Sequence, residues 1–181
     1  LAALFVALTA ASGCQKGPEG SDNGIDDTPV RTSYVNPISV ESLPDPTVIR
    51  GDDGRFWLYA TEDIRNMPIM VSDNLLDWKM EGTVFRTGRP DDVDNEMVWA
   101  PDITKQGGNY ILYYSIAPGN GNPWEYGVGA AVAGAPEGPW ADKGKLFLGG
   151  EVGVRMSIDP FFFEDGGKKY IVWGSYFGLW A

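Results

Sequence analysis

The 181-residue chain carries a net charge of −11 and contains no histidine, and these two features exclude several kinds of site. Without histidine, its residues form neither a Ser-His-Asp or Cys-His pair nor a His-ligated zinc or iron centre, which leaves carboxylates as the main acid–base candidates. The excess of 25 acidic over 14 basic residues argues against a basic face, so we expect no nucleic-acid partner. The 24 glycines, 13 prolines and 7 tryptophans predict short strands and tight turns instead of helices.

The N-terminal segment has the composition of an export signal followed by a tether. Leu1–Gly13 is apolar but too short to span a bilayer, and its small residues run directly into Cys14, which resembles a bacterial lipobox. We expect residues 1–14 to be a truncated lipoprotein signal peptide with Cys14 lipidated; the alternative is a buried free cysteine. Residues 15–33 are rich in Gly, Asp and Pro, which predicts a flexible tether. The implied location is extracytoplasmic and lipid-anchored, on a bacterial membrane.

A weak internal repeat runs through residues 34–181, which we expect to form the folded domain. Three segments align, each with a proline, a short strand, a glycine-containing turn and a second strand rich in aromatic and β-branched residues. The prolines are Pro46, Pro101 and Pro160. The segments read DPTVIRGDDGRFWLYAT, APDITKQGGNYILYYS and DPFFFEDGGKKYIVWGS. In the first two units another strand, turn and aromatic residue follow, ending at Trp78 and Trp140.

Each complete unit therefore contains four antiparallel strands, and this two-tier repetition favours an all-β propeller over a β-sandwich. About two and a half four-stranded blades are present, whereas a closed propeller has about four to eight. The chain also begins without the Met and basic residues of a complete signal peptide, and it ends directly after strand-like residues. These features predict a fragment at both ends, the N-terminal part of a propeller.

Asp45 and Asp159 begin the first strands of units one and three. In a propeller these strands line the central channel, and the loops at their starting ends gather on one face, so both aspartates are expected at the channel mouth. Asp-Pro also occurs simply as a turn sequence before a strand. Ala100, however, occupies the equivalent position in unit two, so the fold does not require an aspartate there. Two carboxylates facing each other shift each other's pKa, as in active sites, which favours a functional role.

Three aromatic residues lie in loops of the same expected face. They are Trp99, Trp124 and Tyr126, which could stack on a sugar ring or simply pack in the structure, and the sequence leaves both open. The acidic run over residues 91–96 lacks the glycine and distant glutamate of an EF-hand loop, so we expect a solvated loop and no metal site.

Taken together, these motifs resemble glycoside hydrolase family 43. The matching pieces are LPDPTVI, SDNLLDW, VWAPDI, APEGPW and SIDPFFFEDGGKKYIVWGS. The resemblance implies a five-bladed propeller that hydrolyses arabinan, arabinoxylan or xylo-oligosaccharides with inversion. It implies that Asp45 is the general base, that Asp159 orients the general acid and raises its pKa, and that Trp99 lines the sugar site. The general acid of the family is a glutamate, and none here matches its motif, so we expect the acid to be absent from this chain and the fragment to be inactive alone. Asp102 of VWAPDI is interpreted as a strand-start cap.

The motifs look most like the arabinan-degrading branch, an endo-1,5-α-L-arabinanase or an α-L-arabinofuranosidase. A β-xylosidase of the same family and a non-catalytic, lipid-anchored glycan-binding propeller are the alternatives. We expect a monomer with a carbohydrate substrate, attached to the membrane only through its lipid. No cofactor is expected to be required, although a structural calcium in the complete propeller stays open.

Overall fold

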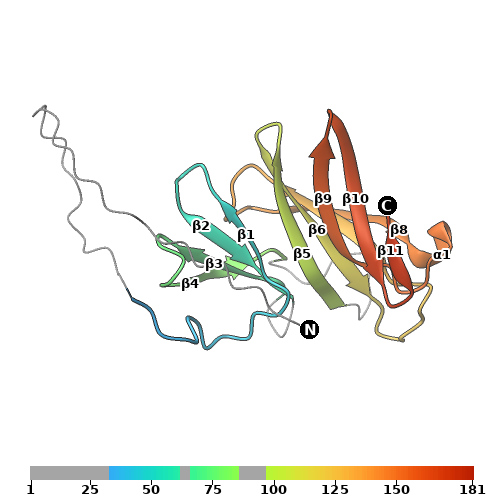
Figure 1. Cartoon of the computed structure of the whole chain (residues 1–181), viewed down its shortest axis with the longest axis horizontal. Helices are drawn as coiled ribbons and strands as arrows, with labels where there is room; N and C mark the ends of the chain where they lie inside the picture. Colours follow the sequence, from blue (N-terminus) through green and yellow to red (C-terminus); the bar gives the residue numbers. More distant parts are fainter. Residues whose placement is uncertain (1–32, 62–65, 86–96) are drawn as a thin grey trace, which may run out of the picture. The chain divides into compact units, whose positions relative to one another are not determined.

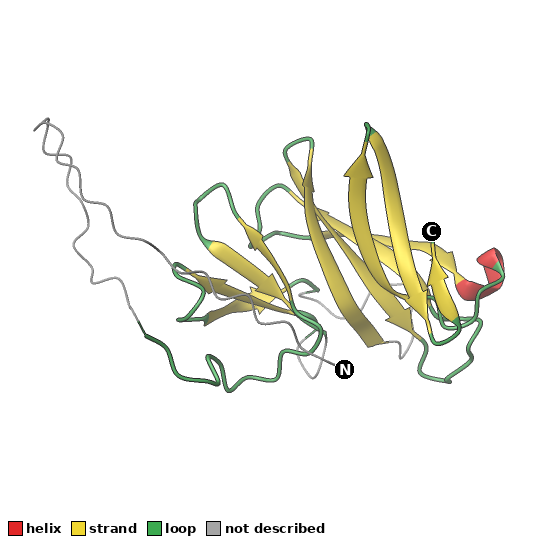
Figure 2. Cartoon of the chain, viewed as in Figure 1, coloured by secondary structure: helices red, strands yellow, loops and turns green. Residues whose placement is uncertain are grey.

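The computed structural model describes residues 33–61, 66–85 and 97–181, and Tyr34–Ala181 form one compact unit. The secondary structure of the described residues is almost entirely strand, with a single short helix (Figure 2). The strands form three successive antiparallel sheets, each made of neighbours in sequence. This arrangement confirms the predicted all-β class and the blades of a partial propeller. Cys14, the expected signal peptide, most of the expected tether and the acidic run at 91–96 lie outside the described residues.

Blade one and blade two each contain four strands, and the third sheet contains three (Figure 1). Blade one comprises β1 (Thr47–Arg50), β2 (Phe56–Tyr59), β3 (Pro68–Ser72) and β4 (Lys79–Thr83). Blade two comprises β5 (Met97–Gln106), β6 (Asn109–Ala117), β7 (Gly127–Ala133) and β8 (Ala141–Leu148). The one-turn helix α1 (Gly149–Val152) then leads to β9 (Ile158–Asp165), β10 (Lys168–Ser175) and β11 (Gly178–Trp180) of blade three.

The hairpins between the first two strands of blades two and three are tight glycine turns, as the sequence predicts. Gly107 and Gly108 connect the paired residues Gln106 and Asn109, with φ of 56° and 85°. The corresponding pair in blade three, Gly166–Gly167, has φ of 56° and 76°. Two consecutive positive φ values define the hairpin turn whose twist matches that of the strands, and glycine adopts them without a steric penalty.

The main hydrophobic core lies between blades one and two. It is built from the inward aromatic residues of β2 and β6, among which Trp57, Tyr59, Tyr110 and Tyr114 are completely buried. The Tyr59 hydroxyl donates a 2.7 Å hydrogen bond to the Pro136 carbonyl of blade two. This cross-blade packing explains why the second strand of each repeat is so rich in aromatic residues: they fill the wedge between neighbouring sheets.

The first strands of the blades are neighbours, because β5 contacts both β1 and β9. Between blades two and three the rings of Tyr113 and Phe162 stack with their centroids 5.8 Å apart. The Lys169 ammonium also donates to the Gln106 side chain at 2.7 Å. The three segments that repeat in the sequence are therefore also neighbours in space, and their starting ends come together.

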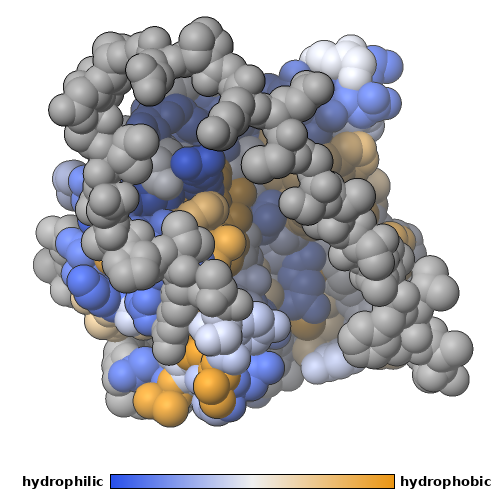
Figure 3. All heavy atoms as spheres, turned by 60° about the vertical axis from the view of Figure 1, so that its left-hand side comes forward, coloured by the Kyte–Doolittle hydropathy of each residue, from blue (hydrophilic) through white to orange (hydrophobic). Residues whose placement is uncertain are grey.

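Away from the core, large hydrophobic side chains reach the surface among hydrophilic ones (Figure 3). Several belong to blade three, where Phe161 is 57% exposed and Leu179 is 77% exposed. Among the described residues no helix is long and apolar enough to cross a membrane.

Candidate active site

The residues before the three repeated prolines share one unusual backbone conformation. Asp45, Ala100 and Asp159 have φ of 49°, 40° and 57°, in the left-handed region that costs a residue with a side chain about 1–2 kcal/mol. The ladder of β5 with β6 is irregular between Trp99 and Asp102, and that of β9 with β10 is irregular opposite Asp159. Since proline has no N–H to give to a ladder, a bulge at X-Pro is the expected local structure.

The shared left-handed conformation partly accounts for the aspartates at two of the three positions. Asp and Asn tolerate positive φ better than most residues, so the backbone alone favours aspartate at Asp45 and Asp159. Ala100 adopts the same conformation without that advantage. The fold therefore requires the backbone geometry but not a carboxylate, as the comparison of the repeats predicted.

Asp45 lies on the surface two residues before β1, and one of its carboxylate oxygens accepts a hydrogen bond from a neighbouring side chain. The Thr61 hydroxyl donates a 2.6 Å hydrogen bond to Oδ2 of Asp45. Thr61 follows β2 and is only 9% exposed, so this donor is fixed by its burial. The contact leaves Asp45 with one carboxylate oxygen bound and with its surface open to solvent, the state required of a base that must reach a water molecule.

Asp159 is held through its backbone and is electrostatically linked to Asp45. Its N–H donates to the Ser115 hydroxyl at 2.8 Å, across the boundary between blades two and three. Partial burial raises the pKa of Asp159 above its usual value, and the negative charge of Asp45 raises it further. The fold thus brings together the two aspartates that the sequence singled out, 114 positions apart in the chain, at the starting ends of β1 and β9.

The three predicted sugar-contact residues differ in exposure. Trp124 is 45% exposed, with the Arg155 guanidinium 5.7 Å from its ring centroid. Trp99 is half-buried, and its ring lies 6.0 Å from that of Tyr126. Tyr126 is only 9% exposed and belongs to a small core cluster with Ile158, next to Asp159. Trp124 and Trp99 therefore offer ring surface to a ligand, whereas Tyr126 packs behind Trp99.

Asp102 connects two blades, which the interpretation as a strand-start cap did not anticipate. It lies within β5, and its Oδ2 accepts the N–H of Phe162 in β9 at 2.7 Å. Burial raises the pKa of this carboxyl group, while the hydrogen bond from Phe162 opposes that rise. Its role in the described structure is to join blade two to blade three near the bulges.

Two glutamates of the described residues accept hydrogen bonds from groups nearby in the chain. Glu125 accepts hydrogen bonds from the side-chain amides of Asn120 and Asn122, at 2.8 and 2.7 Å. Glu151 pairs with Lys145 at 2.7 Å and accepts the Leu148 N–H, which together lower its pKa. A general acid must instead keep its proton near neutral pH. The lowered pKa of Glu151 therefore makes it a poor proton donor to a leaving group.

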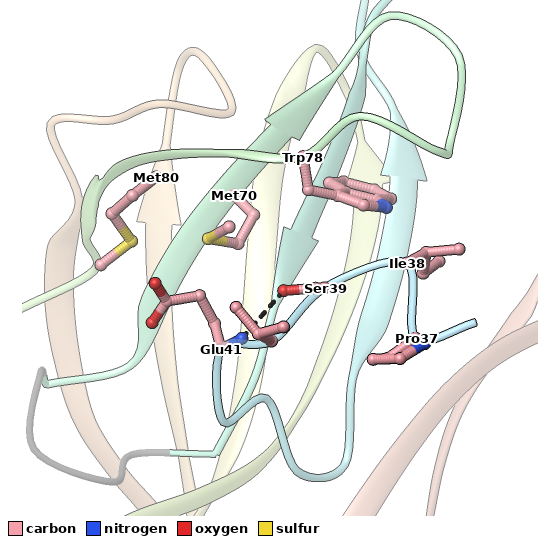
Figure 4. A pocket seen from close by; sticks show the side chains of 8 residues that line it. Pro37, Ile38, Ser39, Glu41, Met70, Trp78 and Met80 are labelled. Carbon is pink, nitrogen blue, oxygen red and sulfur yellow. Dashed lines mark hydrogen bonds between the residues drawn. The ribbon is translucent and has the colours of Figure 1, made fainter. Parts of the chain in front are cut away.

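A cavity of about 350 Å³ lies elsewhere, between the segment 37–41 and the outer strands of blade one. Figure 4 shows Met70, Trp78 and Met80 facing Ile38 and Glu41 across it. Its lining contains one carboxylate and is otherwise mostly apolar, and neither Asp45 nor Asp159 belongs to it. Glycoside hydrolysis by two carboxyl groups does not fit this cavity, because only one carboxylate lines it. Within the described ranges, no group of three or more acidic or cysteine side chains is arranged to hold a metal ion.

Sequence reasoning did not identify Thr61 and Ser115. A signal for both was available, because Thr61, Ser115 and Ser175 are the last residues of the three aligned segments. A hydroxyl-bearing residue at the same place of each repeat indicates a repeated hydrogen bond. In the structure, Thr61 and Ser115 accept the N–H groups of Ala100 and Asp159 in the following blade, both at 2.8 Å.

Known proteins share this fold and more than a quarter of the residues in the matched region. The model of glycosyl hydrolases family 43 matches residues 34–178. The chain is 29% identical over 151 residues to an extracellular endo-α-(1→5)-L-arabinanase of Bacillus subtilis, covering 76% of this chain and 45% of that protein. It is 28% identical over 149 residues to a probable arabinan endo-1,5-α-L-arabinosidase of Aspergillus flavus, covering 79% and 46%.

A crystal structure of a thermostable family-43 glycoside hydrolase superposes with a TM-score of 0.65 and 27% identity, over 78% of this chain and 44% of that one. The chain spans about half the length of the curated relatives it matches. The family model nevertheless covers most of the chain, including both aspartates and all three positive-φ positions before the repeated prolines. The chain therefore belongs to glycosyl hydrolases family 43.

Proposed function

We propose that this protein hydrolyses arabinan-type polysaccharide or oligosaccharides with inversion at the anomeric carbon, as an endo-1,5-α-L-arabinanase or an α-L-arabinofuranosidase. The observation that carries the proposal is the pair Asp45 and Asp159, which the fold brings together from two blades, each in the same left-handed conformation before a proline. The names of the arabinan-degrading relatives support the substrate class. Because the chain spans about half of those relatives, the activity is proposed for the protein expressed from its complete gene.

In the proposed reaction Asp45 is the general base. Its carboxylate takes a proton from water, the water oxygen forms a bond with the anomeric carbon, and the bond to the leaving oxygen breaks with proton donation by a carboxylic acid. Asp159 is proposed to orient that acid and to raise its pKa through its negative charge. No matching glutamate is present among these residues, so the acid is assigned to none of them. The steps use carboxyl groups and water only, and we propose that no cofactor is required.

Sugar binding is proposed for the aromatic residues around the pair. Trp124 and Trp99 expose ring surface on which the C–H face of a furanose can stack, and Tyr126 supports Trp99 from behind. Arg155, placed against both Trp124 and Phe177, holds this rim together, with its guanidinium 4.5 Å from the Phe177 centroid.

The test of the activity is Asp45→Asn, assayed on linear arabino-oligosaccharides. Asparagine keeps the left-handed backbone conformation, so the variant should fold while turnover falls by about 10²–10⁴-fold. The matched control is Asp165→Asn, the same change at the far end of β9 on an exposed residue. Wild-type turnover in Asp45→Asn would contradict the assignment. Proton NMR of the first-formed product should show the inverted anomer, and a retained anomer would contradict the inverting mechanism.

Assays on the same purified protein distinguish the two alternative functions. Faster cleavage of xylo-oligosaccharides than of arabino-oligosaccharides would favour a β-xylosidase. Calorimetric binding of arabino-oligosaccharide without hydrolysis would favour a glycan-binding propeller.

We further propose an extracytoplasmic protein anchored through a lipid on Cys14. The apolar segment before Cys14 and the relatives described as extracellular support this location. Cys14→Ser should move the protein from the membrane fraction to the soluble extracytoplasmic fraction and abolish incorporation of labelled fatty acid. Unchanged fractionation and labelling would contradict lipidation.

A further inference from the structure

The Thr61 hydroxyl makes two hydrogen bonds, and together they determine that its proton points to Asp45. Its oxygen accepts the backbone N–H of Ala100 at 2.8 Å, and the hydroxyl lies 2.6 Å from Oδ2 of Asp45. A backbone N–H only donates, so the threonine oxygen is the acceptor in the first contact. The single hydroxyl proton then points to Asp45, because a carboxylate only accepts.

The backbone of Thr61 strengthens this placement. Its N–H donates to the Pro44 carbonyl at 2.9 Å, directly before Asp45 in the chain. The residue is only 9% exposed, so the neighbouring structure restricts where its hydroxyl can point. Thr61 therefore fixes Asp45 twice, through the preceding peptide and through the side chain.

The equivalent place in blade two shows which part of this arrangement is general. Ser115 accepts the N–H of Asp159 as Thr61 accepts the N–H of Ala100. The acceptor role thus repeats from blade to blade and belongs to the fold. Donation from Thr61 to Asp45 is additional, and it falls on the carboxylate that is proposed to act as the base.

We propose that Thr61 is a positioning residue that selects Oδ1 of Asp45 as the oxygen that takes the proton from water. This inference rests on the proposed function. With Oδ2 held by the hydroxyl, the proton from water passes to Oδ1 while the water oxygen bonds to the anomeric carbon. The glycosidic bond breaks, and its oxygen receives a proton from a carboxylic acid, so charge and atoms balance. Thr61 itself touches neither water nor sugar in this scheme.

The experiment compares Thr61→Val with Thr61→Ser in the protein expressed from its complete gene. Valine has nearly the same shape without the hydroxyl, and it should lower kcat by about 10–100-fold with KM within about 3-fold of wild type, since precise placement of a base contributes on this scale. Serine restores the donor and should return kcat to within about 3-fold of wild type. Thr61→Ala provides a second hydroxyl-free variant if valine prevents folding, judged by circular dichroism.

Ser72→Ala is the matched control. Ser72 is another buried hydroxyl of blade one, 3% exposed, and it also donates and accepts, but both of its bonds go to Asn74. Its loss should lower the melting temperature without lowering kcat. A kcat loss in Ser72→Ala as large as in Thr61→Val would show that the effect is merely structural and would overturn the proposal.

The outcomes separate this inference from the proposed function. If the wild type cleaves arabino-oligosaccharides and the folded hydroxyl-free variants keep its kcat, the role of Thr61 is refuted and the function stands. If serine fails to restore what valine loses, the hydroxyl is not the active feature and the inference also fails. If the wild type cleaves no glycan, the proposed function fails and the role of Thr61 falls with it.

Discussion

Asp159 should reduce the stability of the fold that carries it, and Asp159→Asn tests this. The carboxylate is partly buried and lies near the charge of Asp45, and both effects raise its pKa. Asparagine has almost the same shape and tolerates positive φ, which is 57° at this position. The hydrogen bond to Ser115 comes from the backbone N–H and survives the substitution. The change therefore removes an unfavourable charge and little else.

The expected gain at neutral pH is small because Asp159 keeps substantial contact with solvent. Interactions between charges at such sites amount to about 0.5–1 kcal/mol after screening. For a domain of this size, that gain in unfolding free energy corresponds to a rise in melting temperature of about 1–4 °C. Activity should fall in the same variant, since Asp159 is proposed to orient and tune the general acid.

The pH dependence follows from the direction of the pKa shift. The folded-state pKa of Asp159 lies above its usual 3.8, so the folded protein holds this proton more tightly than the unfolded chain. Its contribution to stability is full below pH 3.8 and is lost as the pH rises through the folded-state pKa. Asp159→Asn should therefore match the wild type at acidic pH and exceed it at neutral pH.

Calorimetric melting of the wild type, Asp159→Asn, Asp45→Asn and the double variant, at pH 3.5 to 7, measures both effects. Because part of the pKa rise comes from Asp45, the gain from Asp159→Asn should shrink in the Asp45→Asn background. A variant less stable than wild type at pH 7, or a gain independent of pH, would refute the reasoning. An unchanged gain in the double variant would show that the two carboxylates do not interact.

Two further predictions concern the blade junction and the aromatic rim. Asp102→Ala should lower the free energy of unfolding by about 1.5–3 kcal/mol in urea titrations, because the half-buried N–H of Phe162 loses its charged acceptor. Asp102→Asn keeps an acceptor and should lower the free energy of unfolding far less. Equal losses in the two variants would contradict this account. Trp124→Ala should raise KM for arabino-oligosaccharides by about 5–150-fold, if sugar stacking on the ring contributes about 1–3 kcal/mol, as the stacking of a nucleic-acid base on an aromatic side chain does. Steady-state kinetics with unchanged KM would remove Trp124 from the binding surface.

The sequence was sufficient for the blades because each blade is specified locally. Glycine pairs such as Gly107–Gly108 define the hairpins through their positive φ, and the alternation of β-branched and aromatic residues defines the strands. Repetition of this pattern then predicts the architecture, since a sheet with an apolar face must pack against its neighbour. Asp45 and Asp159 stood out for the same reason, because an aligned repeat makes Ala100 a direct comparison.

Contacts between blades could not be predicted in this way. The contact of Thr61 with Ala100 and that of Asp102 with Phe162 depend on how one sheet lies on the next.

What the sequence alone determined is therefore the repeating element and the identity of its exceptional residues. What only the tertiary structure decided is their electrostatic and hydrogen-bonding environment. The physical reason is range: turns and strands depend on residues a few positions apart, whereas the pKa of Asp159 depends on a charge 114 positions away, and Oδ2 of Asp45 depends on a hydroxyl that a second blade holds in place.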